Sequence, residues 1–247
     1  MVTQREQLIC KLPDASRIKL IGLGGVGCIV LEYLAVFLKS LNQQVRLVLI
    51  DGDKFEESNN SRMIFYEMGN KAEVKAADVM EVLESSKVNV VPVSEYITDA
   101  NIDQLIKPGD HVFLCVDNHA TRKLVSDHCS KLNTITLISG GNEGVEPPHE
   151  RGTYGNVQVY LRKDGKDVSN PLTKFHPEIA NPKGKRPDQM SCVEMAASTP
   201  QILFTNLAVA SAMLNAFFAQ CCNQLTYQEV KFDIVEARML PQMPMPK

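Results

Sequence analysis

The sequence has no marked excess of charge of either sign. Its 247 residues include 26 lysines and arginines against 29 aspartates and glutamates, a formal net charge of −3. This balance gives no reason to expect general binding to nucleic acids or to anionic membranes. The chain also lacks internal repeats and any break in composition, so we expect one large α/β domain over residues 1–247.

No Cys-x-x-Cys pair occurs in the chain, which argues against a structural zinc site built from two such pairs. The seven cysteines are odd in number and most lie in apolar runs, as is typical of free thiols in a reducing compartment. The N-terminus lacks a basic segment followed by an apolar core and a cleavage site, so no signal peptide is expected. These absences together predict a cytoplasmic protein.

Charged residues are also missing from the stretch 195–228, of which residues 200–218 are largely apolar. Threonine, asparagine, serine and glutamine interrupt this stretch, which disfavours a helix that crosses a membrane. We expect instead a helix over 200–222 that is buried in the core or covered by a second subunit.

Short β-branched runs alternate with helical patterns over most of the chain. This alternation predicts a Rossmann-like α/β fold with a mainly parallel sheet, helices on both faces and antiparallel strands at one end. The predicted strands are 18–21, 45–50, 88–93, 112–116, 134–139, 156–161 and 230–235, and the predicted helices are 26–41, 73–83, 119–132 and 200–222. Residues 163–191 break the rhythm and are rich in glycine, proline and polar residues, which predicts a long mobile crossover loop over the sheet.

A glycine-rich turn joins the first predicted strand to the first predicted helix. Its glycines are Gly22, Gly24, Gly25 and Gly27. They allow a sharp turn and close approach of a ligand, with backbone N–H groups and a helix N-terminus facing an anion. The turn therefore predicts a nucleotide phosphate site, although a turn of this kind can also serve packing alone.

Two carboxylates follow the second predicted strand. Asp51 lies at the strand tip, where a side chain can accept hydrogen bonds from ribose hydroxyls. Asp53 comes two residues later, and a turn cap is the commoner role for an aspartate there. Up to this point, a dinucleotide-dependent dehydrogenase remains open.

Later segments supply Asn59, Arg62, a lysine that is either Lys71 or Lys75, and Asp117. Arginine offers a planar fork to phosphate oxygens, lysine a point charge, and aspartate a hard oxygen ligand for Mg²⁺. Hydride transfer would have no use for such a polyphosphate and metal constellation, which disfavours the dehydrogenase.

These motifs, in this order, resemble the ThiF/MoeB and ubiquitin-activating superfamily, whose members adenylate the C-terminal carboxylate of a ubiquitin-like protein. The resemblance covers residues 19 to about 237 and rests on Gly22-Leu-Gly-Gly-Val-Gly27, Asp51-Gly-Asp53, Ser58-Asn-Asn-Ser-Arg62, Lys75 and Cys115-Val-Asp-Asn118. It implies that the glycine turn holds ATP, Asp51 the ribose, and Asp117 Mg²⁺.

By the same resemblance, Asn59, Arg62 and a lysine contact the ATP phosphates, and Arg62 and the lysine serve catalysis. Lys75 fits the spacing of the family better than Lys71, which we expect to be a solvated charge near the helix start. The partners implied are a ubiquitin-like or sulfur-carrier protein with a C-terminal glycine, a conjugating enzyme, and a second copy of the chain in a homodimer.

Cys192, near the end of the crossover segment, is a candidate second catalytic residue. Many relatives carry a reactive cysteine here that forms a thioester or acyl-disulfide with the activated carboxylate, and a thiolate is a good acyl acceptor. The alternative is a small residue that anchors the loop.

The chain departs from the family pattern in three ways. The zinc-binding cysteine pairs are absent, no arginine precedes the first strand in a recognisable helix, and the sequence after Cys192 is Val-Glu-Met-Ala-Ala in place of an Ala-Gly-rich flank. These departures favour a divergent bacterial branch tied to ubiquitin-like conjugation or to PRTRC-type gene systems.

Three functions stay open. The first is adenylation followed by thioester formation on Cys192, and the second is adenylation alone for sulfur-carrier or tRNA-modifying chemistry. The third is a non-catalytic dimer partner, which the presence of Arg62, Lys75 and Asp117 disfavours.

Overall fold

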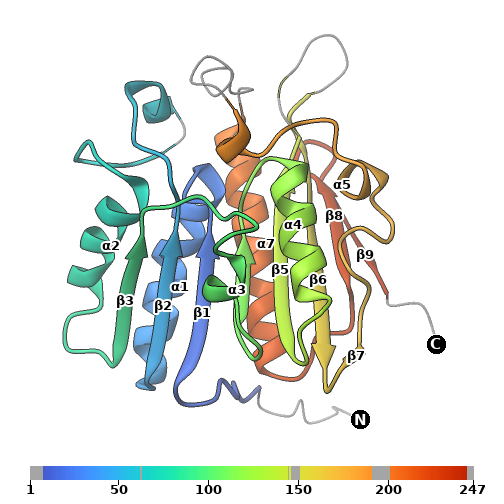
Figure 1. Ribbon diagram of the computed structural model, residues 1–247, viewed down its shortest axis with the longest axis horizontal. Helices are drawn as coiled ribbons and strands as arrows, with labels where there is room; N and C mark the ends of the chain where they lie inside the picture. The colour runs from blue at the N-terminus through green and yellow to red at the C-terminus, as the bar shows by residue number, and fades with distance from the viewer. Residues whose placement is uncertain (1–7, 62, 144, 146–150, 191–200, 244–247) are drawn as a thin grey trace.

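A computed structural model describes residues 8–61, 63–143, 145, 151–190 and 201–243 (Figure 1). Within these residues a nine-stranded sheet has the order β3-β2-β1-β4-β5-β6-β8-β9, with β7 paired to β6. The strands are β1 Ser16–Ile21, β2 Val45–Ile50, β3 Val88–Val93, β4 His111–Leu114, β5 Ile135–Asn142, β6 Tyr154–Lys163, β7 Lys166–Asp167, β8 Glu229–Asp233 and β9 Arg238–Gln242. The helices are α1 Gly25–Leu41, η1 Glu57–Ser61, α2 Lys71–Val82, α3 Ile102–Leu105, α4 His119–Cys129, α5 Pro177–Ala180, η2 Pro187–Gln189 and α7 Leu203–Cys221.

Strands β1 to β5 run parallel to their neighbours, whereas β6, β7, β8 and β9 pair antiparallel at one end of the sheet. This arrangement confirms the predicted fold class. Every predicted strand and helix is present, with ends shifted by a few residues. Strand β9 was missed, because it exists only as the partner of β8, to which Ala237 in the left-handed region (φ 51) returns the chain.

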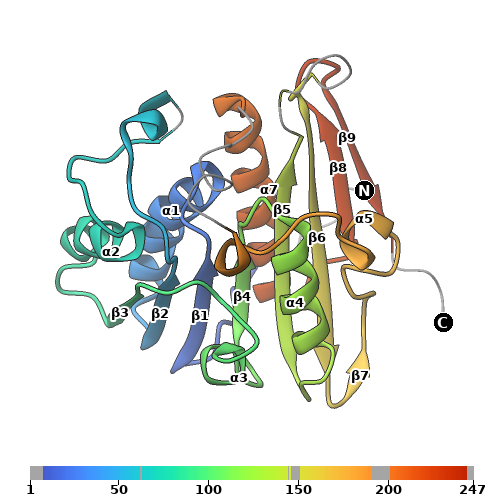
Figure 2. The ribbon, with the colours of Figure 1, turned by 45° about the horizontal axis from the view of Figure 1, so that its top comes forward.

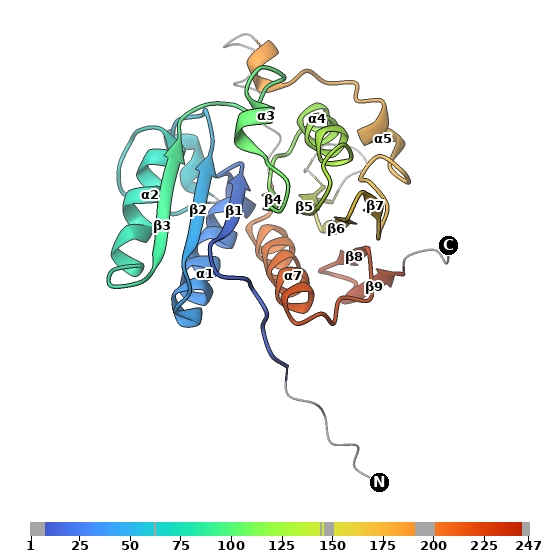
Figure 3. The ribbon, with the colours of Figure 1, turned by 60° about the horizontal axis from the view of Figure 1, so that its bottom comes forward.

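The two faces of the sheet carry separate hydrophobic cores. Helices α1, α2 and α7 cover one face, with Leu34, Val79 and Met213 in one buried cluster. The other cluster includes Ile102 of α3 and Val125 of α4. Figure 3 shows α1 and α7 on one side of the sheet and α3, α4 and α5 on the other. Helices on both faces are what continuous apolar strands require.

Helix α7 is long and apolar enough to cross a membrane by length and composition alone, with a mean hydropathy of 1.3. The helix nevertheless packs against α1, β5 and β6, and its Val209, Met213 and Phe217 are buried in the core. A core helix of a soluble protein meets the same length and composition criterion. The packing supports the predicted buried helix.

Residues 163–190, the described part of the predicted crossover segment, run beside α4 in both views (Figures 1 and 2). This part of the predicted loop contains the short elements β7, α5 and η2. Asp164 and Gly165 adopt positive φ angles (50° and 76°) that reverse the chain between β6 and β7. Arg186, just before η2, forms an ion pair with Asp99 at 2.7 Å. Mobility of the segment stays a prediction.

Candidate active site

The candidate site lies at the carboxyl ends of β1 and β4, neighbouring strands at which the strand order reverses. β1 continues into the glycine turn and α1 on one face, and β4 continues into residues 115–118 and α4 on the other. In open α/β sheets, ligands bind outside the carboxyl ends of the strands at such a switch point. Figure 2 brings this edge of the sheet forward.

The glycine turn has no room for side chains at two positions. Gly22 has φ +89°, and a Cβ on it would lie 3.0 Å from the backbone carbon of Cys115. A Cβ on Gly27 would lie 1.9 Å from the Gly22 carbonyl oxygen. Gly24, the N-cap of α1, makes no side-chain cap and faces open space. The uncapped N–H groups of α1 therefore face a space that a phosphate can enter.

Asp51 ties the tip of β2 to this turn. Its Oδ2 accepts a hydrogen bond from the Leu23 N–H at 2.6 Å, and its Oδ1 accepts one from the Asp53 N–H at 2.9 Å. Burial raises the pKa of Asp51, while the charge of Lys71 and these N–H donors oppose the rise. The carboxylate thus lies beside the turn, as a ribose ligand would have to.

Lys71 is a functional candidate that the sequence analysis misjudged. The side chain is only 7% exposed and forms an ion pair with Asp53, so the expectation of a solvated charge is wrong. The reason is the cap of α2. The Asn70 side chain accepts a hydrogen bond from the Ala72 N–H at 2.8 Å and donates to the Asp51 and Asp53 carbonyls at 3.0 Å each. This cap starts α2 at Lys71 and holds the first turn of the helix next to residues 51–53, the loop after β2 (the β2 loop).

Lys75, the lysine that the spacing favours as the phosphate ligand, is 3% exposed and has other partners than Lys71. Its Nζ donates to the Ile64 carbonyl at 2.7 Å and to Asp78 Oδ2 at 2.8 Å, and lies 6.0 Å from the centre of the Phe55 ring. Burial raises the pKa of the Cys28 thiol in α1 to about 12, and Lys75 and Lys71 both oppose that rise. Both ammonium groups therefore lie near the start of α1, and the role of Lys75 stays a prediction.

The other predicted phosphate ligands are less defined. Asn59 is buried in η1, where its Oδ1 accepts a hydrogen bond from the Glu56 N–H at 3.1 Å. The amide oxygen of Asn59 thus stabilises the turn that carries it. Arg62 and Cys192 lie outside the described residues, so their catalytic roles stay predictions.

Asp117 is exposed just past the end of β4 and is the one carboxylate of the predicted set that is not tied to the β2 loop. The described residues contain no group of three or more histidines, cysteines, aspartates or glutamates that could hold a metal ion. A single free carboxylate nevertheless fits Mg²⁺, which takes one or two carboxylates and completes its shell with phosphates and water. The donor set is thus compatible with a metal that arrives with a nucleotide.

Arg122, on the buried face of α4, was not assigned a role from the sequence. Its Nε and Nη2 donate to the Val116 carbonyl at 3.0 and 2.9 Å, and Nη2 also donates to the Gly140 carbonyl at 2.9 Å. Burial lowers the pKa of this guanidinium, and nearby Asp117 opposes the shift. A Cβ on Gly141 would lie 2.5 Å from the guanidinium nitrogens. Arg122 thus holds the segment that carries Asp117 against β5. In the sequence, the only indication that Arg122 is buried is its helical spacing to the apolar residues Val125 and Cys129.

His176, in the crossover segment, lies between two carboxylates. Its Nδ1 is 2.6 Å from Glu178 Oε1 and its Nε2 is 2.9 Å from Glu229 Oε1 on β8. The hydrogen bond to Glu229 is the main cause that raises the pKa of His176 above 6.5. Burial would raise the pKa of Glu229, but the hydrogen bonds from His176 and Asn156 lower it below 4.5.

These shifts predict a pH-dependent contribution to stability. A raised histidine pKa stabilises the fold fully below about pH 6.5, and this contribution is lost as pH rises through the folded-state pKa. We expect His176→Gln to lower the free energy of unfolding by about 1 kcal/mol more at pH 6 than at pH 8.5. Urea titrations at the two pH values measure this difference, with Lys163→Gln at an exposed position of β6 as the control. An equal loss at both values would mean that the charge of His176 adds nothing.

Comparison with known proteins agrees with this geometry. The sequence profile of the ThiF family matches residues 6–245. The molybdopterin-synthase adenylyltransferase of Escherichia coli is 26% identical over 189 residues, which are 76% of this chain and 67% of that protein. The adenylyltransferase and sulfurtransferase MOCS3 of Bos taurus is 33% identical over 117 residues, 47% of this chain and 25% of that protein.

Among solved structures, Escherichia coli MccB crystallised with ATP has the same fold, with a TM-score of 0.65 at 15% identity. The alignment covers 93% of this chain and 64% of the MccB chain. The chain thus spans only part of the length of the proteins it resembles. Because the family profile covers nearly all of its residues and the glycine turn, the β2 tip and the β4 end meet at one edge of the sheet, the protein belongs to the ThiF family.

Proposed function

We propose that this protein uses ATP to adenylate the C-terminal carboxylate of a small carrier protein. The observation that carries the proposal is the convergence of the glycine turn, Asp51 and Lys71 at one switch point, in a family whose named relatives are adenylyltransferases. The carboxylate oxygen of the carrier attacks the α-phosphorus of ATP, and the bond from that phosphorus to the bridging oxygen breaks. Pyrophosphate leaves, and the carrier ends as an acyl-adenylate.

Two anions meet in this reaction, so catalysis depends on positioning and on neutralisation of charge. The N–H groups at the start of α1 receive phosphate oxygens, Asp51 receives the ribose, and Arg62 contributes a guanidinium. Of the two lysines, we assign Lys71 to the phosphates, because its partner Asp53 has a half-exposed carboxylate that can yield it to a ligand. Lys75 remains the alternative. Asp117 would hold Mg²⁺, which supplies charge neutralisation at the phosphates.

Exchange of labelled pyrophosphate into ATP tests the proposal. We expect exchange only when a carrier with a C-terminal Gly-Gly is present, because the reverse reaction needs the acyl-adenylate. The same carrier with its C-terminal carboxylate converted to an amide is the control, because it has no carboxylate oxygen to attack ATP. Binding of ATP without exchange, across ubiquitin-like and sulfur-carrier candidates, would contradict adenylation and favour a non-catalytic dimer partner.

A finer proposal concerns the fate of the adenylate. We infer that Cys192 attacks the acyl carbon, so that a thioester forms and AMP leaves, as in the branch that hands its carrier to a conjugating enzyme. Adenylation alone, for sulfur-carrier or tRNA-modifying chemistry, is the alternative.

Cys192→Ala separates the two. We expect pyrophosphate exchange to stay within about twofold of wild type, because adenylation does not use the thiol. A carrier adduct that reducing agents release should disappear on non-reducing gels, whereas Cys10→Ala should keep it. Survival of the adduct in Cys192→Ala would leave the cysteine with a structural role only.

The homodimer remains a proposal, supported by an apolar surface on α1 and α7. Tyr33 and Phe204 are 60% and 69% exposed, and Val36, Leu207 and Phe218 of the same two helices are also exposed. A second copy of the chain would cover this surface. Light scattering of the protein in solution measures its mass and so distinguishes a dimer from a monomer. Cytoplasmic location is likewise proposed, and the six cysteines of the described residues are all free thiols, as it requires.

A further inference from the structure

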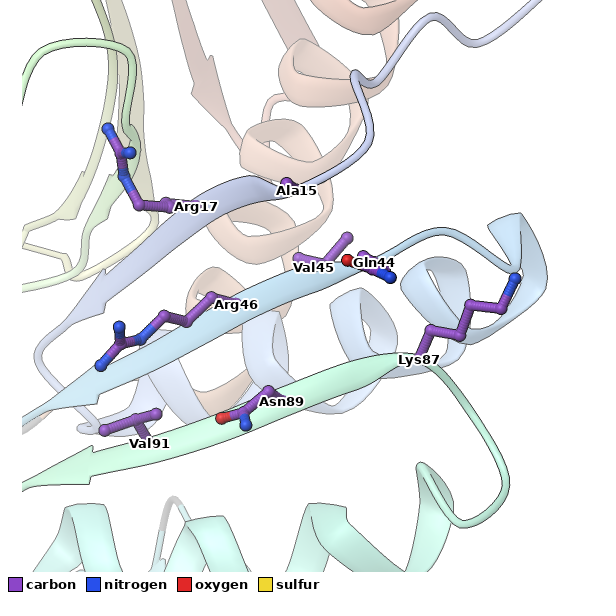
Figure 4. Close-up of a pocket in the computed structure, with 8 residues that line it drawn as sticks. All are labelled: Ala15, Arg17, Gln44, Val45, Arg46, Lys87, Asn89 and Val91. Atoms are coloured by element: carbon purple, nitrogen blue, oxygen red, sulfur yellow. The ribbon is translucent and has the colours of Figure 1, made fainter.

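A groove of about 600 Å³ lies at the opposite end of the sheet from the candidate active site. It is lined by residues within or just before the first four positions of β1, β2 and β3: Ala15, Arg17, Gln44, Val45, Arg46, Lys87, Asn89 and Val91. Figure 4 shows Arg17, Arg46 and Asn89 on three adjacent strands. The lining contains three cations and two side-chain amides but no carboxylate. We name it the basic groove.

Two of the cations are cross-strand neighbours. Arg17 and Arg46 occupy partner positions in the parallel pairing of β1 and β2. Like charges that face each other across neighbouring strands destabilise a sheet. Lys19 adds to the repulsion. Burial lowers the pKa of Lys19, the charges of Arg46 and Arg17 lower it further, and the charge of Asp110 opposes this shift. The fold therefore keeps positive charges near the starts of β1 and β2 whose mutual repulsion opposes stability.

Two carboxylates beside this cluster are already engaged, and one of them, Asp14, accepts a hydrogen bond from the Gln44 N–H at 2.7 Å. Asp110 accepts hydrogen bonds from Arg17 Nε at 2.5 Å and from the Lys107 N–H at 2.9 Å, and lies 3.6 Å from Lys19 Nζ. Within the described ranges, no acidic side chain pairs with Arg46 or Lys87. The groove thus presents unneutralised charge on a molecule whose net charge is −3.

We propose that the basic groove docks an acidic, extended segment of a partner protein. Carboxylates of that segment would pair with Arg46 and Lys87, and the amides of Gln44 and Asn89 can hydrogen-bond a peptide backbone. The groove is shallow and open, which suits an extended chain better than an enclosed small molecule. A long nucleic acid is disfavoured, because the acidic remainder of the surface would repel it. The site does not depend on the proposed adenylation, because it lies at the other end of the strands.

The test uses the full chain and a fluorescein-labelled octapeptide of alternating glutamate and aspartate, followed by fluorescence anisotropy. We expect the double variant Arg46→Glu/Lys87→Glu to weaken binding at least about tenfold, and binding to weaken as NaCl rises from about 50 to 200 mM. Lys163→Glu/Lys166→Glu, on exposed lysines of the β6–β7 hairpin, changes the net charge equally and should bind as wild type does. The same peptide made of glutamine and asparagine should not bind.

Equal weakening by both double variants would overturn the proposal, because the attraction would then follow net charge alone. So would binding of inorganic phosphate or of a single-stranded RNA, dependent on Arg46, without binding of the acidic peptide.

Stability gives a second readout that needs no ligand. Because Arg46 opposes Arg17 and Lys19, Arg46→Gln should raise the Tm by about 1–3 °C. A lower Tm would show that Arg46 serves the fold, and would remove the argument that the charge is kept for a partner.

Discussion

Lys71→Met is expected to slow pyrophosphate exchange by about a hundredfold while the protein stays folded. The ammonium of Lys71 pairs with Asp53, and the neighbouring Asp51 carboxylate binds the Leu23 N–H of the glycine turn, so the lysine lies beside the proposed nucleotide site. Loss of one preorganised charge at such a position typically costs two to three orders of magnitude. The stability cost should be about 1–2 kcal/mol, because water can replace the lysine at half-exposed Asp53, whereas buried Asp51 loses the positive charge that opposes its desolvation.

Lys75→Met is the matched variant, with the opposite expected profile. It leaves the Ile64 carbonyl and Asp78 without their buried donor, so it should cost about 1–3 kcal/mol of stability. Its exchange rate, measured where both variants are folded, should fall less than that of Lys71→Met. If Lys75→Met loses more activity instead, Lys75 is the phosphate ligand, as its spacing from Arg62 predicted.

Arg122→Leu is expected to lower the free energy of unfolding by about 3 kcal/mol, or the Tm by about 6–12 °C. The substitution leaves the Val116 and Gly140 carbonyls buried without donors. It also frees the segment after β4 to move, so the affinity for ATP with Mg²⁺ should fall more than the affinity for ATP alone. Thermal unfolding and calorimetric titrations with and without the metal measure both effects.

Two further variants isolate the cause. Arg122→Lys keeps the charge but loses the planar fork, and should lie between wild type and Arg122→Leu in both measurements. Lys123→Leu removes a neighbouring partly exposed ion pair with Asp127 and should cost less than about 1 kcal/mol. If Arg122→Leu unfolds within about 1 kcal/mol of wild type, the hydrogen bonds to the two carbonyls do not hold this edge of the sheet.

Much of the fold could be read from the chain because its signals are local. Short runs rich in valine, isoleucine and leucine predicted β1, β2 and β3. Gly22 is required by its positive φ, and Gly27 by the 1.9 Å at which a Cβ would approach the Gly22 carbonyl oxygen. The position of Asp51 could be predicted because it directly follows β2, and the carboxyl end of that strand lies beside the glycine turn in this type of fold. Strand β9 was missed because its residues are mostly exposed and carry no apolar pattern. The elements β7, α5 and η2 were missed because each has only two to four residues.

Side-chain roles in the site were harder to predict. Lys71 and Lys75 lie on the same side of one helix, and spacing alone favoured the second. The deciding feature is the Asn70 cap, whose amide also bonds two carbonyls of the β2 loop. A capping residue can be recognised in a sequence, but its other hydrogen bonds cannot.

The sequence by itself determined the order of strands and helices, the glycine turn and the acidic tip of β2, because hydrophobic period and backbone freedom are properties of consecutive residues. Only the tertiary structure decided which ammonium faces Asp53, why an arginine is buried in α4, and that cations of neighbouring strands share one groove. These depend on atoms brought together from segments far apart in the chain, and desolvation and Coulomb energies change steeply over a few ångströms.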